Sequence, residues 1–147
     1  MLSARLIHLI ETHQEEISNR ILHDIRRHPE LFHIKRLQEP ELRELGRQIL
    51  SGLGKWLAEE GELAREYERI GKTRYEESVP LHESVRALYI IKNKMIDFVK
   101  DQVVTWDSME LYAEEELERR AGRFFDELVI HLVRGYEGAW RRAAHAA

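Results

Sequence analysis

Apolar residues recur at intervals of three and four along most of the chain, which is the spacing of one buried helix face. They form five stretches separated by short connections, and none shows the alternation typical of a β-strand. The predicted helices span residues 3–28, 40–57, 62–77, 80–104 and 107–142. The pattern therefore predicts an all-α fold, a five-helix bundle of globin-like or up-and-down topology with a long C-terminal helix.

The composition narrows the class of protein. The chain has 147 residues, 43% of them hydrophobic and 34% charged, which suits one helical domain with solvated outer faces. The net charge of −4 argues against a nucleic-acid partner, and the absence of cysteine excludes disulfides and thiol catalysis. No apolar run reaches the roughly 20 residues of a membrane span. We therefore expect a single cytoplasmic domain over residues 1–147 with no membrane insertion.

Two cations fall on helix faces that should be buried. In the predicted helix 62–77, Tyr67 and Ile70 continue a rhythm of four and three that leads to Arg74. In the predicted helix 80–104, a rotation of about 100° per residue places Lys92 inside an arc of leucine, valine and methionine side chains. Because an unpaired cation in a core is costly, we expect both to find carboxylates.

Asp24 and Glu83 are the expected partners of these cations. Asp24 lies on the inward arc of the first predicted helix, whereas Glu83 projects from the side opposite Lys92 and must reach another helix. Together Arg74, Glu83, Lys92 and Asp24 form a candidate network for a signal or a ligand. The alternative is that both cations snorkel and extend their charged ends into water at the edge of the bundle.

The last predicted helix has an unusually wide apolar arc, which covers roughly half its circumference. An exposed stripe of that size aggregates unless a partner covers it, so we expect a homodimer. The expected dimer face consists of Phe125, Val129, Val133, Tyr136 and Trp140. The chain ends in Arg-Arg-Ala-Ala-His-Ala-Ala without a stop signal, which we interpret as a helix that leads into a further module of a longer signalling protein.

The segment 74–92 carries a family resemblance. The residues that carry it are Arg74, Ser78-Val79-Pro80-Leu81, Glu83-Ser84, Tyr89 and Ile91-Lys92. This run resembles the signature of the RsbRD-type N-terminal regulatory domain, a relative of the RsbT co-antagonist proteins. The chain departs from it at Ser78, where the family usually has glycine, and at Val79, where it usually has an aromatic residue. The resemblance implies a helical domain that receives a signal ahead of a histidine-kinase, anti-anti-sigma or related output domain.

A second resemblance, to haem-binding globin-coupled sensors, concerns the cofactor. Gly71 and Pro80 keep the frame of a Gly-x-x-His helix followed by a proline, but Arg74 stands where the haem-ligating histidine would be. A guanidinium offers no lone pair to iron. The sequence therefore predicts a haem-less relative of these sensors without a cofactor.

Neither a metal site nor catalysis is indicated. His8 and His13, like His23 and His28, are five residues apart and so point to different faces of a helix. We expect His13 to be a hydrogen-bonded core histidine. The motifs of nucleophilic catalysis and of phosphate-binding glycine loops are absent from the sequence. The chain is predicted not to be an enzyme.

These observations favour a non-enzymatic sensor or regulatory domain that self-associates and relays a signal to an output domain. One alternative is a small-molecule carrier or sensor with an apolar pocket near Arg74 and Lys92, between the third and fourth predicted helices. Another is a structural helical adaptor, in which substitution of either cation has no consequence.

Overall fold

The computed structural model of the chain describes residues 4–57, 64–102 and 108–146. Within these residues every regular element is helical, which confirms the predicted all-α class and the long C-terminal helix. The elements are α1 (Ala4–Thr12), α2 (Gln14–Arg27), the 3-10 helix η1 (Ile34–Arg36), α3 (Glu39–Leu57), α4 (Ala64–Glu76), α5 (Leu81–Gln102) and α6 (Ser108–Ala146). The predicted helix starts at Ser3, Glu62 and Asp107 and the predicted end at Val104 lie outside the described residues.

The described residues contain six α-helices where five were predicted, because the first predicted helix is divided at His13. The His13 backbone has φ −109° and ψ 25°. Its ring Nδ1 lies 2.9 Å from the carbonyl oxygen of Leu9, to which the His13 backbone N–H also donates. The ring packs on Phe98 with 5.3 Å between centroids. The expected hydrogen bond of His13 is confirmed. The His13 ring competes with the His13 backbone N–H for the carbonyl oxygen of Leu9, which accounts for the break between α1 and α2.

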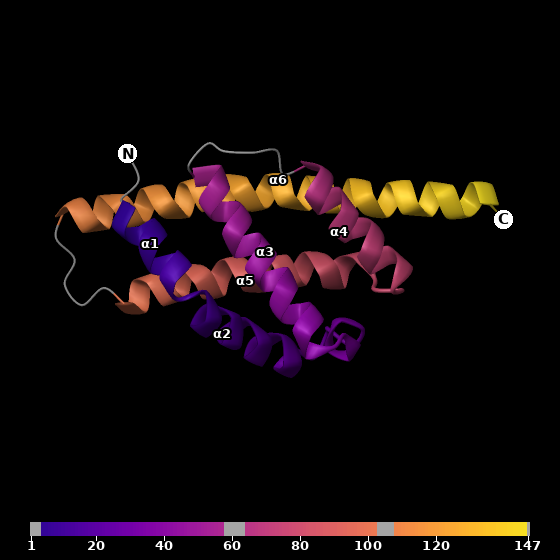
Figure 1. Cartoon of the computed structure of the whole chain (residues 1–147), viewed down its shortest axis with the longest axis horizontal. Coiled ribbons are helices and arrows are strands. Elements are labelled where there is room, and N and C mark those ends of the chain that lie inside the picture. Colours follow the sequence, from indigo (N-terminus) through magenta and orange to yellow (C-terminus); the bar gives the residue numbers. More distant parts are fainter. Residues whose placement is uncertain (1–3, 58–63, 103–107, 147) are drawn as a thin grey trace.

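Helix α6 runs along the whole length of the molecule, and α5 lies beside it in the opposite direction (Figure 1). The two helices are joined near both ends, since Ser84 bonds Tyr136 and Lys100 pairs with Glu118. Helix α4 packs on α6, α2 and α1 pack on α5, and α3 contacts α1 and α2 (Figure 1). Among the helices of the described residues, none has both the length and the apolar character needed to cross a membrane.

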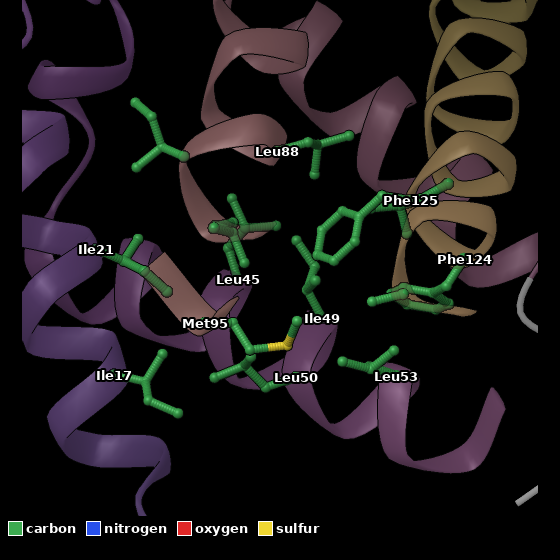
Figure 2. Packing of buried hydrophobic residues seen from close by; sticks show 14 of the residues in the cluster. Ile17, Ile21, Leu45, Ile49, Leu50, Leu53, Leu88, Met95, Phe124 and Phe125 are labelled. Atoms are coloured by element: carbon green, nitrogen blue, oxygen red, sulfur yellow. The ribbon is translucent and has the colours of Figure 1, made fainter. Parts of the chain in front are cut away.

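The hydrophobic core draws side chains from every helix of the described residues, and most of them come from α2, α3, α5 and α6. Figure 2 shows its central members, which are Ile17, Ile21, Leu45, Ile49, Leu50, Leu53, Leu88, Met95, Phe124 and Phe125. In α3, the buried residues Leu45, Ile49 and Leu53 are those that the spacing of three and four predicts. Full burial of one such side chain contributes about 1.5–3 kcal/mol, so these positions stabilise the arrangement of the helices.

Helices α4 and α6 touch backbone to backbone where Gly71 crosses Gly135. A Cβ atom on Gly71 would collide with the carbonyl oxygen of Leu132, and one on Gly135 would collide with that of Glu68. Both obstacles belong to the backbone and cannot rotate away as a side chain can. The crossing of α4 over α6 therefore depends on two positions that require glycine.

Candidate functional site

The candidate site is built around the connection between α4 and α5. Helix α4 ends in a Schellman motif, in which Val79 N–H donates to Arg74 O at 3.0 Å and Ser78 N–H donates to Tyr75 O at 2.9 Å. The motif needs a left-handed residue, and Ser78 supplies it with φ 61°. The RsbRD-type domain, which residues 74–92 resemble, usually has glycine at this position. Pro80 directly precedes Leu81, the first residue of α5, and its missing N–H has no cost there because no helical acceptor would face it.

Arg74 is buried at the end of α4, as predicted, with 7% of its surface exposed. Its carboxylate partners are not the predicted ones. Nη2 donates to Glu41 Oε1 of α3 at 3.0 Å, and Nε lies 3.1 Å from Glu77 Oε1. Nη1 is buried and has no hydrogen-bond partner among the described residues. These three residues, Arg74, Glu41 and Glu77, are referred to below as the Arg74 cluster.

Glu77 is the titratable member of the Arg74 cluster. Burial, the hydrogen bond with Glu41 and the negative charge of Glu41 together raise the pKa of Glu77 to about 7, although the Arg74 guanidinium acts in the opposite direction. A carboxyl that lies beside a second carboxylate in a partly buried space keeps its proton to higher pH than an isolated one. The cluster therefore changes its charge near neutral pH.

Glu83 is almost fully buried but contacts neither cation, so its predicted pairing is wrong. Its carboxylate accepts the backbone N–H groups of His33 at 2.8 Å and Ile34 at 3.2 Å, and the ring Nδ1–H of His33 at 2.6 Å. Burial alone would raise the pKa of Glu83, but these hydrogen bonds and the charge of His33 hold that pKa below its ordinary value. Glu83 does reach another element, as expected, and anchors η1 to α5.

Lys92 and Asp24 lie outside the Arg74 cluster, and the four predicted residues do not form one network. Lys92 is half-buried at the edge of the buried face of α5, with its ammonium 5.8 Å from the centre of the Tyr89 ring. Asp24 pairs with Lys94, with 3.0 Å between Oδ2 and Nζ. At the rim of a buried arc, a long side chain carries its charge out of the core, so Lys92 follows the snorkelling alternative.

Tyr136 joins α6 to the site, a role that the sequence prediction missed. It was expected on an exposed dimer face, but only 6% of it is exposed. Its hydroxyl donates to the carbonyl oxygen of Val79 at 2.9 Å, so the Ser84 hydroxyl, 2.6 Å away, donates to Tyr136. Burial raises the pKa of Tyr136 to about 12. The position of Tyr136 four residues after the buried Leu132 is the sequence signal that places it on the core side of α6.

The predicted dimer face divides into a buried part and an accessible part. Phe125 and Tyr136 are buried within the chain because α5 packs on this side of α6, so their assignment to a dimer face is wrong. Val129 and Val133 are half-buried. Trp140 is 61% exposed. The accessible apolar stripe of α6 is therefore narrower than the spacing predicts.

Arg74 also lines a groove of about 520 Å³ between α3 and α4. Most of the other residues that line it are charged or polar, including Glu41, Glu66 and Arg69, and Lys92 is not among them. The space next to Arg74 is thus not the apolar pocket that was expected near both cations. A groove with these walls suits a polar or charged molecule.

The arrangement has two chemical capacities. The Arg74 cluster can take up or release a proton near neutral pH, and among the described residues Nε and Nη1 of Arg74 are buried without a hydrogen-bond partner and can bind a polar group. In the part of the chain that the structure describes, no three histidine, cysteine, aspartate or glutamate side chains are placed to hold a metal ion.

Comparisons with protein-family models, curated proteins and solved structures find no match for this chain. The likeness of residues 74–92 to the RsbRD-type domain stays a prediction from those residues.

Proposed function

We propose that the chain is a non-enzymatic sensor or regulatory domain of signal transduction, which self-associates and relays a signal to an output domain such as a histidine kinase or an anti-anti-sigma module. The observation that carries the proposal is the hydrogen bond from Tyr136 of α6 to Val79, next to the Arg74 cluster. The resemblance of residues 74–92 to a regulatory domain supports the same function. These residues include the connection between α4 and α5, at which the Arg74 cluster lies. A cytoplasmic location and a globin-like topology belong to the same proposal.

The Arg74 cluster has the physical properties of a switch. It places two carboxyls at one buried cation and leaves Nη1 of Arg74 unbonded within the described residues. A change of protonation at Glu77, or the arrival of a polar ligand, alters which groups attract one another. Because Tyr136 holds the Val79 carbonyl, a shift in the connection changes the contact between α5 and α6.

Helix α6 provides the surface for self-association. Val129, Val133 and Trp140 follow one another at intervals of four and seven residues, so they lie on one stripe. Glu137 and Arg141 beside Trp140 carry opposite charges, and a two-fold axis across the stripe would place each near its opposite in a second copy. We propose a homodimer formed through this stripe.

The mass of the protein in solution tests the dimer. Trp140→Glu puts a charge on the stripe, and sedimentation equilibrium should then give a monomer where the unaltered chain gives a dimer. Tyr112→Glu is the matched control, because Tyr112 is an exposed aromatic residue, 66% accessible, near the start of the same helix. It should leave the dimer intact. A monomeric unaltered chain, or dissociation by both substitutions, would refute the proposed interface.

A double substitution tests the relay from the Arg74 cluster to α6. Glu77→Gln removes the titratable group from residue 77, so this position stays uncharged at every pH. We expect the substitution to change the amide hydrogen exchange of residues 129–140. In a Tyr136→Phe background, which keeps the ring but removes the bond to Val79, the same substitution should have a much smaller effect. Equal changes in both backgrounds, or no change in either, would rule out Tyr136 as the link.

A further inference from the structure

A second groove, between α4 and α6, is lined mainly by cations. It has a volume of about 500 Å³ and includes Gly135 of the glycine crossing. We refer to it as the arginine groove. Its charged lining residues are Arg65, Glu68, Arg69, Lys72, Arg134 and Arg142. Five cations therefore face one carboxylate in a chain whose net charge is −4.

The acidic side chains that the structure describes leave most of these cations without an ion pair. Within the described residues none of the four arginines has a carboxylate partner, and Lys72 only reaches Glu76 at 3.8 Å. The groove between α2 and α5 shows the contrast, since its cations Arg20, Lys94 and Lys100 each pair with an acidic side chain at 3.0 Å. Among the described side chains, the lining of the arginine groove thus carries an excess of positive charge, although Arg65 and Arg69 also line the groove between α3 and α4.

Glycines of α6 give the groove its depth. Gly135 and Gly138 place no side chains on its floor, and the Arg142 guanidinium lies over Gly138, with Nη1 3.6 Å from where a Cβ atom would stand. The close crossing at Gly71 and Gly135 holds the cations of both helices around one space. Like charges gathered in this way repel one another, and an anion between them removes the repulsion.

We propose that the arginine groove binds a small soluble molecule that carries two or three phosphate groups. A guanidinium matches two phosphate oxygens with parallel hydrogen bonds, which a single ammonium cannot do. Five cations exceed what one phosphate group needs, and a groove of about 500 Å³ falls in the range of about 300–1,000 Å³ typical of small-molecule sites. The class of ligand is therefore a di- or triphosphate.

Such a ligand bridges α4 and α6, because the cations come from both helices. It would strengthen the contact of α4 with α6 beside the Arg74 cluster. The ligand would then be the signal of the sensor, and this assignment rests on the proposed function. The existence of the binding site does not depend on that function.

Titration calorimetry of the whole chain with inorganic triphosphate tests the site. The unaltered chain should bind with an affinity that falls as salt is added. Arg69→Gln and Arg134→Gln, one on each helix, should each weaken binding about tenfold or more. Both side chains are exposed, so circular dichroism should show that the variants keep their helices.

Gly138→Leu fills the floor of the arginine groove without a change in charge and should also weaken binding. Arg123→Gln, an exposed arginine of α6 outside the groove, should bind as the unaltered chain does.

Several outcomes would overturn the site. One is an unaltered chain that does not bind triphosphate, and another is an equal loss of affinity in Arg123→Gln. Equal affinity for citrate would contradict recognition of phosphate. Binding to vesicles of phosphatidylglycerol and phosphatidylcholine by a chain that ignores triphosphate would place the anion on a membrane surface instead. Sedimentation without ligand reports on the dimer alone, so failure of the site and failure of the sensor proposal remain distinguishable.

Discussion

Helix α4 makes two contacts of opposite kinds, one turn apart. At the first, Gly71 lies against Gly135 of α6, and neither position accepts a Cβ atom without a collision. At the second, Arg74 holds Glu41 and Glu77 and keeps a buried donor unbonded within the described residues. The first contact permits one arrangement, whereas the second permits more than one state of charge. The end of α4 can therefore respond to a proton or a polar ligand while its crossing with α6 stays fixed.

Disrupting the contact between Gly71 and Gly135 should have the largest effect. Gly71→Ala pushes a methyl group against the carbonyl oxygen of Leu132, so α4 must move away from α6. We expect the free energy of unfolding to fall by about 3 kcal/mol, despite a gain of about 1 kcal/mol in helix propensity. Urea denaturation measures this change. Gly122→Ala is the control, because nothing lies within 4 Å of its added Cβ atom, and it should stabilise the protein. Equal effects of both would contradict the fixed crossing.

Glu83 is a second fixed contact, because this carboxylate accepts three hydrogen bonds from His33 and Ile34. Glu83→Ala leaves the part-buried N–H of His33 and the buried N–H of Ile34 without their acceptor, and we expect a loss of about 2 kcal/mol in urea denaturation. The control is Glu76→Ala at an exposed position of α4, which should change stability by less than about 0.5 kcal/mol.

The pH dependence of the Glu83 contribution has a definite sign. The pKa of Glu83 lies below its ordinary value in the folded state, so its contribution is complete above the ordinary pKa and is lost as pH falls through the folded one. The unaltered chain and Glu83→Ala should therefore approach each other in stability at acid pH. A difference that persists unchanged would contradict the anchor.

Glu77 should show the opposite sign. Its pKa is raised to about 7, so the stabilisation from its proton is complete below the ordinary carboxyl pKa and is lost as pH rises through 7. Glu77→Gln keeps an uncharged donor and should be more stable than the unaltered chain at pH 8 by about 1.5 kcal/mol, after allowance for solvent screening, with little difference at pH 5. Urea denaturation at both values measures this, and a difference independent of pH would contradict it.

The smallest expected effect concerns the turn between the two contacts. Ser78 has φ 61°, which costs a residue with a Cβ atom about 1 kcal/mol, so Ser78→Gly should stabilise the protein by up to that amount. Thermal unfolding measures the gain. Ser51→Gly is the same substitution in the interior of α3, where it should destabilise instead. A loss of stability in Ser78→Gly would contradict the Schellman assignment.

Helical periodicity predicted most of the fold because burial follows the spacing of apolar residues. The buried positions Ile49 and Leu53 of α3 and the inward direction of Arg74 at the end of α4 come from that spacing. The break at His13 was not predictable in this way, because it arises from a hydrogen bond of one ring to the Leu9 carbonyl and leaves the apolar pattern intact.

The partners within the site depend on how the helices cross, which a single helix pattern does not contain. The three-dimensional arrangement decides that Arg74 meets Glu41 and that Glu83 meets η1. Likewise, Tyr136 was placed on a dimer face because the width of the apolar arc of α6 was visible in the sequence, whereas the cover that α5 provides was not.

The Arg74 cluster is proposed to titrate near neutral pH and to act on α6 through Tyr136. A carbon-13 NMR titration of the whole chain, with label in the glutamate carboxyl and tyrosine ring carbons, follows both groups in one experiment. We expect the Glu77 carboxyl to titrate with a midpoint of about 7 and the Tyr136 ring signal to shift with the same midpoint. A Glu77 midpoint at the ordinary carboxyl pKa, or a Tyr136 signal that stays constant through the Glu77 transition, would contradict it.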